Sequence, residues 1–402
     1  MLKNKTVLLG VSGGIACFKA VALASALVKL NCDVQVVMTK NACEFVSPLS
    51  FEAITSNDVY IDTFENKRAR EIDHISLADR ADLVVIAPAT ANVIAKLANG
   101  IADDMLTSTV LACDCPKMIC PAMNTRMYEN PVTQDNLKKL EHYGWEILEA
   151  DSGVLACGTI GKGRLPESEY IKERILHKIG MEKIFEGLNI LVTAGATKEA
   201  IDPVRFITNH SSGKMGYSIA KIAAAMGANV TLISGNATVD PPAFTNFIKV
   251  NSAVDMFEEV KKYSPSSQIV IMCAAVADYT PKTVSEHKIK KGKTDELVLE
   301  LKRNPDILKY LGEHREENQF LCGFAMETRD LIENAGKKLR EKNVDMIVAN
   351  SLKDEGAGFQ TDTNLVTILS RDEQIKVPLM DKSKVAERIL KTIKERMEFG
   401  QD

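Results

Sequence analysis

Short β-branched runs alternate with longer segments of helical period along this chain of 402 residues, and this alternation most restricts its fold. It is typical of a mostly parallel sheet with helices on both faces. The pattern occurs twice, and each half begins with a strand, a glycine-containing loop and an Ala-rich helix. We therefore expect two doubly wound, Rossmann- or flavodoxin-like α/β domains in tandem. Their strands are predicted at Thr6–Leu9, Val34–Met38, Leu83–Ala87, Met118–Cys120 and Trp145–Leu148, then at Ile190–Val192, Val230–Ile233, Ile248–Val250, Ile269–Met272, Phe320–Cys322 and Met346–Val348.

A charged segment of helical period, Glu167 to Gly187, separates the two series. We place the boundary within residues 180–188, which gives domains of residues 1–187 and 188–402. Two late strands, at Asn364–Leu369 and Ile375–Val377, and a helix from Lys382 are expected to complete the second domain.

Composition excludes several classes of protein. Hydrophobic residues make up 45% and charged residues 26%, as in ordinary globular proteins, and the net charge of −4 argues against nucleic-acid binding. Neither a signal peptide nor an apolar stretch of membrane-spanning length is evident, so we expect a cytoplasmic protein with reduced cysteines and no membrane association. The grouping Cys113, Cys115 and Cys120 could suggest zinc, but no second cluster completes a ligand set, which favours core thiols.

Unusual residues follow the predicted strands. In open α/β sheets, ligands bind beyond the carboxyl ends of the strands, so two sheets predict two sites. The longest such segment runs from Thr193 to Gly216, where strand-to-helix connections usually take about 2–6 residues. Its Ile, Val, Phe and Pro residues favour a ligand-binding loop over a disordered insertion.

Four features of the first half are candidates for chemistry. The glycine loop Ser12–Gly14 stands at a strand-to-helix turn, where it could cradle a phosphate or only permit tight packing. His74, Asn124 and Cys157 each have an ordinary interpretation as well: a surface histidine, a helix cap and a buried thiol.

Taken in order, the glycine loop, HISLA, APATAN, PAMN and ACGTIGKGR of residues 5–166 resemble flavin-dependent cysteine decarboxylases, specifically the phosphopantothenoylcysteine decarboxylase domain. One departure is Tyr128, where that family commonly has Trp. The resemblance implies FMN as cofactor, His74 as a base, Asn124 as the group that holds the substrate carboxylate, and Cys157 as the final proton donor. It also implies that FMN is bound by Ser12, Gly13, Gly14, Thr39, Thr90, Ala91 and Asn92.

The second half contains TAGATKEAIDPVRFITNHSSGKMG, CAAVADYTPK, KIKK, RNPDI, GFAMET and VAN, which together resemble phosphopantothenate–cysteine ligases. Taken singly, the lysine run is an ordinary solvated surface and NPDI an ordinary helix cap. The resemblance implies ligation of 4′-phosphopantothenate to L-cysteine with CTP through an acyl-cytidylate. Lys288 would stabilise the triphosphate, Asn209 would bind the acyl-cytidylate, and Asp278 is a candidate Mg²⁺ ligand. The implied CTP site comprises Ala274, Ala275, Asp278, Lys288, Pro305, Asp306, Ile307, Leu308, Phe324, Lys338 and Lys342.

The whole chain thus resembles bacterial bifunctional enzymes that carry both activities. By the same resemblance, decarboxylase trimers and ligase dimers would combine into a homo-oligomer, a dodecamer. Two alternatives remain: a flavin reductase that uses a nicotinamide nucleotide in its second half, and a non-catalytic regulatory homologue. The first lacks a dinucleotide fingerprint, and the second should have lost the candidate catalytic residues.

Overall fold

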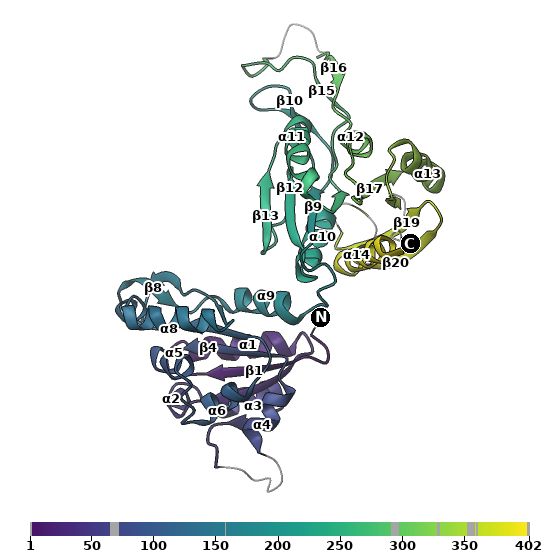
Figure 1. Cartoon of the computed structure of the whole chain (residues 1–402). Helices are drawn as coiled ribbons and strands as arrows, with labels where there is room; N and C mark the ends of the chain where they lie inside the picture. Colours follow the sequence, from purple (N-terminus) through teal and green to yellow (C-terminus); the bar gives the residue numbers. More distant parts are fainter. Residues whose placement is uncertain are drawn as a thin grey trace. The chain divides into compact units, whose positions relative to one another are not determined.

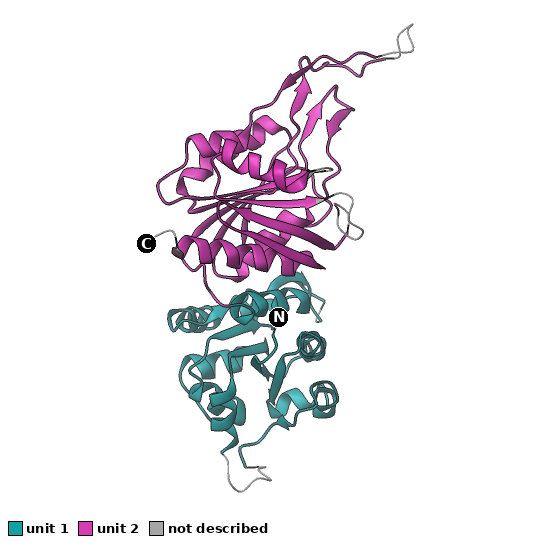
Figure 2. Ribbon diagram, turned by 90° about the vertical axis from the view of Figure 1, so that its right-hand side faces the viewer, with its two compact units in different colours: residues 1–181 teal, residues 182–402 magenta. Residues whose placement is uncertain are grey.

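The computed structural model describes residues 2–64, 72–156, 158–290, 297–327, 330–351, 358 and 361–399. The chain divides into two compact units, residues 1–181 and 182–402, which Figure 2 shows in different colours. This division falls six residues before the boundary that we expected at 187/188. The charged segment between the domains forms helix α9 (Ser168–Ile179), which ends before Gly187, where its sequence pattern ends. Within the described residues, no helix is both long and apolar enough to cross a bilayer.

Unit 1 contains a six-stranded parallel sheet in the order β3-β2-β1-β4-β5-β6, of which β1 and β4 are labelled in Figure 1. Its strands are β1 (Thr6–Val11), β2 (Asp33–Met38), β3 (Val59–Tyr60), β4 (Leu83–Ala89), β5 (Lys117–Pro121) and β6 (Glu146–Ile147). Its other helices are α1 (Cys17–Val28), α2 (Lys40–Cys43), α3 (Pro48–Thr55), α4 (Asp73–Arg80), α5 (Ala91–Ala98), α6 (Met105–Ala112), α7 (Thr125–Tyr128) and α8 (Pro131–His142).

Strand periodicity builds two cores, one on each face of this sheet. Val7, Leu9 and Val11 of β1 pack with α1, α3 and α9, whereas Leu8 packs with α4, α5, α6 and α8. Successive strand residues point to opposite faces of the sheet, and both faces are covered by helices. This burial on both faces explains why the sequence of β1 is a continuous apolar run. The doubly wound prediction is confirmed for this unit.

Unit 2 contains an eight-stranded sheet in the order β13-β12-β9-β14-β17-β18-β19-β20, parallel except for the pairs β18–β19 and β19–β20. Its strands are β9 (Asn189–Ala194), β12 (Asn229–Ser234), β13 (Thr245–Lys249), β14 (Ile269–Met272), β17 (Phe320–Glu327), β18 (Met346–Ser351), β19 (Thr363–Ser370) and β20 (Gln374–Asp381). Helices α11 (Ala253–Tyr263), α12 (Ile307–Glu313) and α13 (Leu331–Glu341) share one core cluster, while α10 (Lys214–Ala225) packs against α14 (Lys382–Phe399). The mostly parallel α/β prediction is therefore confirmed here too.

The edge strand β20 pairs irregularly with β19. The register shifts between Asn364 and Val366, so that Val377 and Met380 have partners on β19 while Pro378 lies between them. β20 has no neighbour on its other side among the described strands.

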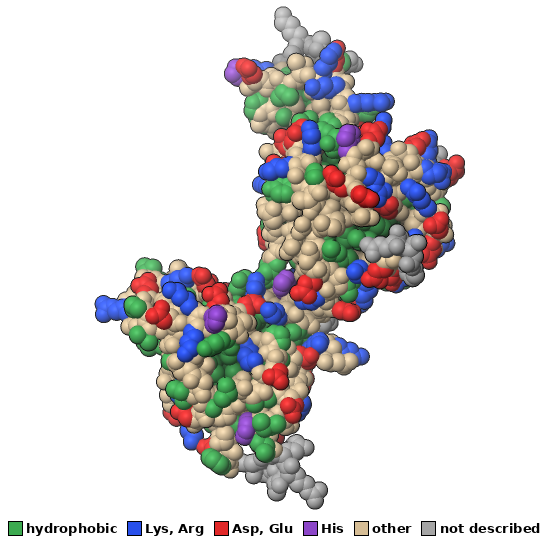
Figure 3. All heavy atoms as spheres, viewed as in Figure 1, with side chains coloured by type: hydrophobic (Ala, Val, Ile, Leu, Met, Phe, Trp, Pro, Cys, Tyr) green, Lys and Arg blue, Asp and Glu red, His purple; other side chains and the backbone are tan. Residues whose placement is uncertain are grey.

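Three short antiparallel pairs project from the sheets, and the sequence patterns did not predict them. They are β7 (Asp151–Val154) with β8 (Ile160–Arg164), β10 (Lys198–Ala200) with β11 (Phe206–Thr208), and β15 (Tyr279–Pro281) with β16 (Leu301–Arg303). The second lies inside the long Thr193–Gly216 segment, which is thus partly a hairpin. On the face shown in Figure 3, acidic and basic side chains are interspersed.

Candidate active sites

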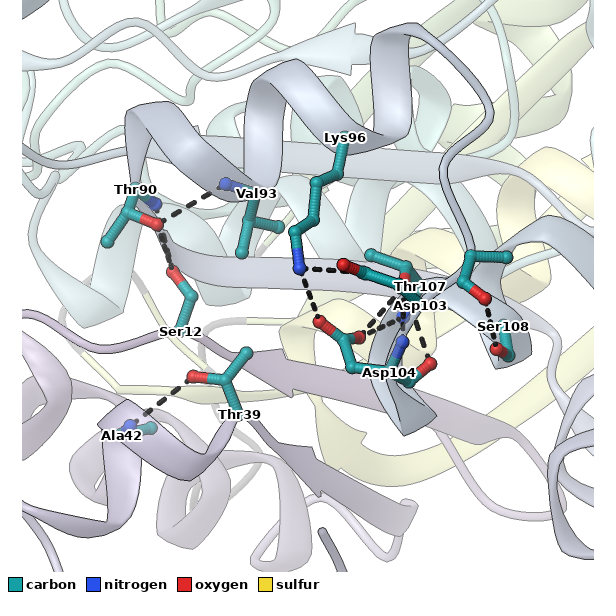
Figure 4. A network of polar contacts seen from close by, with 11 residues as sticks. Ser12, Thr39, Ala42, Thr90, Val93, Lys96, Asp103, Asp104, Thr107 and Ser108 are labelled. Carbon is teal, nitrogen blue, oxygen red and sulfur yellow. Dashed lines mark hydrogen bonds and ion pairs between the residues drawn. The ribbon is translucent and has the colours of Figure 1, made fainter. Parts of the chain in front are cut away.

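In unit 1, the loops after β1 and β4 meet where the chain order of the sheet reverses. The Ser12 hydroxyl donates a hydrogen bond to the Pro88 carbonyl at 2.8 Å and accepts one from the Thr90 backbone N–H at 2.9 Å. Ser12 is fully buried. Its side chain therefore ties the two loops together (Figure 4).

The two glycines after Ser12 have different roles. A Cβ on Gly13 would lie 2.4 Å from Cβ of Asn41, whereas one on Gly14 would meet no heavy atom nearer than 3.8 Å. Tight packing thus accounts for Gly13 but not for Gly14. The backbone N–H groups of both glycines make no hydrogen bond to any residue that the structure describes, so they remain as donors for an anion.

A cavity of about 650 Å³ opens beside these loops. Five of the residues predicted to bind FMN line it: Gly13, Thr39, Thr90, Ala91 and Asn92. Thr90 caps α5 through its side chain, and the first N–H groups of that helix, on Ala91 and Asn92, have no acceptor among the described residues. Ligand pockets commonly measure roughly 300–1,000 Å³, so size and donors both suit a phosphorylated ligand such as FMN.

Five charged residues that the sequence patterns did not single out also line this cavity: Lys40, Asp62, Lys96, Asp103 and Asp104. The ammonium group of Lys96, on α5, lies 2.6 Å from Oδ1 of Asp103 and 3.1 Å from Oδ2 of Asp104 (Figure 4). The hydrogen bond that Lys96 donates to Asp103 raises the pKa of Lys96 above its usual value. Burial would raise the pKa of Asp104, but hydrogen bonds from Thr107 and Lys96 outweigh it and hold that pKa low.

His74 and Asn124 lie outside the lining of the cavity. His74 is half-buried in the first turn of α4. Asn124 precedes α7 and accepts a hydrogen bond from the Arg126 N–H at 2.9 Å, so its interpretation as a helix cap is confirmed. Met127, on the same short helix, does line the cavity. Tyr128, where the decarboxylases commonly have Trp, is buried in the core.

Cys157 lies outside the described residues, but both strands that flank it are described. The Met123 N–H donates to the carbonyl of Gly163 on β8 at 2.9 Å. A Cβ on Gly163 would lie 2.2 Å from the Met123 carbonyl oxygen, and one on Gly161 would lie 2.5 Å from Oγ1 of Thr125. Two glycines of this hairpin are thus required because β8 packs tightly against the loop that carries Asn124.

In unit 2, the corresponding reversal of chain order lies between β9 and β14. Asn209 Nδ2 donates to the carbonyls of Ala275 at 3.2 Å and Val276 at 3.4 Å, and its side chain is exposed. The Ala277 N–H donates to Thr197 Oγ1 at 3.0 Å. The structure therefore brings Asn209 together with the predicted CTP loop that starts at Ala274.

The other predicted CTP residues extend this region. Asp306 caps α12 and forms an ion pair with Lys342, while Lys338 donates to the Phe324 carbonyl at 2.9 Å. Burial would raise the pKa of Asp306, but the hydrogen bond from Lys342 and the helix N–H lower it below its usual value. The helix-cap interpretation of NPDI is confirmed.

Asn304 belongs to the RNPDI motif but was not among the predicted site residues. Its backbone N–H donates to the Asp278 carbonyl at 2.9 Å, and its Nδ2 donates to the Ala277 carbonyl at 2.8 Å. Its Oδ1 is buried with no hydrogen-bond partner within the described structure. Asn304 therefore holds the loop around the exposed Asp278 in place. The described residues contain no group of three His, Cys, Asp or Glu side chains that could hold a metal.

Lys288 is exposed and lies beside the turn of the β10–β11 hairpin. Its neighbour Ile289 donates its N–H to Asp202 Oδ2 at 3.1 Å and accepts from Arg205 Nη2 at 2.6 Å. Burial would raise the pKa of Asp202, but Arg205 and nearby N–H groups lower it strongly. Asn209 follows the other end of β11, a strand of three residues that spans about 10 Å at the usual strand rise.

Comparisons with known proteins cover nearly the whole chain. Residues 1–180 match the family described as Flavoprotein, and residues 185–397 match the DNA/pantothenate metabolism flavoprotein C-terminal domain. The coenzyme A biosynthesis bifunctional protein CoaBC of Bacillus subtilis (strain 168) is 52% identical over 397 residues, which are 98% of this chain and 97% of the relative. Its counterpart from Vibrio cholerae serotype O1 is 44% identical over 399 residues, with 98% and 99% covered. A crystal structure of the C-terminal domain of a CoaBC protein is 47% identical and covers 54% of this chain and 99% of that chain, with a TM-score of 0.47.

Proposed function

Because this chain belongs to the family of coenzyme A biosynthesis bifunctional proteins, we propose an assignment of each reaction to one half of it. The chain is a bifunctional enzyme with ligase and decarboxylase activities. Residues 188–402 form 4′-phosphopantothenoylcysteine from 4′-phosphopantothenate and L-cysteine at the expense of CTP. Residues 1–187 decarboxylate that product to 4′-phosphopantetheine with FMN. The observation that carries the proposal is the cavity beside β1 and β4, lined by five of the expected FMN residues.

The decarboxylation needs an electron sink. A carboxylate beside an ordinary amide-bearing carbon loses CO₂ with difficulty, because the resulting carbanion is not stabilised. FMN, when bound, would supply a two-electron acceptor for oxidation of the substrate thiol to a thioaldehyde, and would be reoxidised when the ene-thiol is reduced. CO₂ then leaves, and the electron pair of the broken C–C bond stays on the substrate, where it is delocalised onto sulfur to give an ene-thiol.

The residues of the first half provide positioning and proton transfer. His74 removes a proton in the oxidative step, the Asn124 amide holds the substrate carboxylate, and Cys157 protonates the final carbon. Positioned acid–base groups contribute about 10²–10⁴-fold in rate. The contact between β8 and Met123 supports this arrangement, because it anchors the hairpin that carries Cys157 beside the loop of Asn124.

The ligation needs an activated carboxylate. The carboxylate of 4′-phosphopantothenate attacks the α-phosphate of CTP, pyrophosphate leaves, and the cysteine amine then displaces CMP from the acyl-cytidylate. Lys288 stabilises the triphosphate and Asn209 binds the acyl-cytidylate. The hydrogen bonds from Asn209 to the carbonyls of Ala275 and Val276 support its place at this site. Asp278, which is exposed, would hold Mg²⁺ together with the nucleotide phosphates, and the ion would neutralise phosphate charge during activation.

Assembly and location complete the proposal. We expect a cytoplasmic homo-oligomer, a dodecamer of decarboxylase trimers and ligase dimers.

One experiment tests the assignment. The purified full-length chain should be yellow. With CTP, Mg²⁺, cysteine and 4′-phosphopantothenate, it should release pyrophosphate and then CO₂. A colourless protein that does not bind added FMN would contradict the proposal. Flavin-dependent oxidation of a nicotinamide nucleotide without CTP would favour a reductase, and binding without turnover would favour a regulator.

A further inference from the structure

Lys96 occupies an unusual position for a helix lysine. Its side chain is only 20% exposed, it lines the cavity of unit 1, and its ammonium group contacts the carboxylates of Asp103 and Asp104. Residues 99–104 join α5 to α6, so these contacts fasten the connection between the two helices to the side of α5.

The carboxylate of Asp104 contacts two groups, Thr107 and Lys96. Its Oδ1 accepts from both the N–H and the hydroxyl of Thr107, each at 2.8 Å, which caps α6, while its Oδ2 contacts Lys96. Figure 4 shows the carboxylate between the two groups. The cap fixes Asp104 at the cavity wall whether or not Lys96 is present.

The charges around the cavity make this lysine important. The lining contains two lysines, Lys40 and Lys96, and three carboxylates, Asp62, Asp103 and Asp104, so its formal charge is 2 − 3 = −1. Loss of Lys96 would make it −2. Lys40 pairs with Asp62 and has an exposed side chain, so it does not replace Lys96 beside the other two carboxylates.

We propose that Lys96 is a positioning residue of the flavin site, which neutralises Asp103 and Asp104 and fixes the 99–104 connection so that the cavity accepts an anionic cofactor. This inference depends on the proposed FMN function of unit 1. FMN carries a phosphate, and charge near the flavin ring changes its reduction potential. A cavity wall with two unneutralised carboxylates would oppose both the phosphate and the reduced ring.

The test compares FMN binding by apoprotein of the full chain, measured by quenching of flavin fluorescence, together with the midpoint potential of the bound flavin. We expect Lys96→Met to weaken FMN binding by about tenfold or more and to make the potential more negative. Lys96→Arg should bind nearly as the wild type does. Lys96→Met combined with Asp103→Asn should regain most of the lost affinity, because the formal charge of the lining returns to −1.

Two controls keep the outcomes distinct. Lys138→Met removes an exposed lysine of α8 outside the cavity and should leave FMN affinity unchanged. Asp103→Asn alone should bind FMN at least as tightly as the wild type, which keeps the test valid if Lys96→Met fails to fold. Wild-type affinity in Lys96→Met, or equal losses in the single and double variants, would overturn the role of Lys96. A wild-type chain that binds no FMN would instead refute the proposed function itself.

Discussion

Replacement of Ser12 by Ala tests whether the two loops of the flavin site depend on one buried hydroxyl. The Pro88 carbonyl retains a hydrogen bond from the Ser12 N–H at 3.2 Å, but the Thr90 N–H loses its acceptor. A fully buried donor without a partner costs about 1–3 kcal/mol, but Thr90 is only partly buried and lines the cavity. We therefore expect unit 1 to lose about 1 kcal/mol of unfolding free energy, the low end of this range.

The chain offers a direct assay, because its single tryptophan, Trp145, lies in unit 1 and packs against one of the two cores there. Urea unfolding of the flavin-free full chain, followed by tryptophan fluorescence, therefore reports on unit 1 alone. With a urea m-value of about 2 kcal/mol per molar, the loss corresponds to a midpoint lower by about 0.5 M.

Ser47→Ala provides the matched control. Ser47 is exposed and precedes α3 without making a side-chain capping bond, so its replacement should leave the midpoint nearly unchanged. If the midpoint of Ser12→Ala fell by less than about 0.3 M, or by no more than that of the control, the hydroxyl would not hold the loops.

Three further predictions concern the two reactions and the pH response. Cys157→Ser should still release CO₂ but not form 4′-phosphopantetheine; normal product in mass spectra would exclude Cys157 as proton donor. Lys288→Gln should abolish CTP-dependent ligation while decarboxylation of supplied 4′-phosphopantothenoylcysteine continues, and equal loss of both would argue against separate sites. Because the pKa of Asp306 is lowered in the folded chain, its charge stabilises the fold above about pH 4 and this contribution is lost as pH falls further. Asp306→Asn keeps a helix cap, so only the charge is lost. The free energy of opening of α12, measured by hydrogen exchange, should therefore be lower than in the wild type above pH 4 and should approach it below pH 4. A difference that does not change with pH would contradict the lowered pKa of Asp306.

The sheets could be predicted from sequence because each central strand is a continuous apolar run. Val7, Leu8 and Leu9 are all buried, and only a strand covered on both faces buries successive residues in this way. The ends of those runs also identified the loops at which the candidate sites lie. Element limits were less accurate: the helix expected to run to Gly187 ends at Ile179, and the strand expected at Trp145–Leu148 comprises only Glu146 and Ile147.

The short hairpins and several site residues depend on contacts between distant segments, which local patterns do not encode. Gly163 must be glycine because Met123 lies against it, 40 positions earlier in the chain. Lys96 resembles any lysine on an amphipathic helix until the turn after α5 brings Asp103 and Asp104 back to it. Asn304 is recognisable only once its side chain is seen to hold the loop at Ala277.

The irregular edge strand β20 affects how copies of this protein avoid aggregation. A straight, unpaired strand would offer a neighbouring molecule a ladder of backbone donors and acceptors. Pro378 has no N–H to contribute, and the register shift between Val377 and Met380 interrupts the regular pairing of β20 with β19. Substituting valine at this position would remove that protection, and slow fibrous or amorphous precipitation in concentrated solution would be the sign of it.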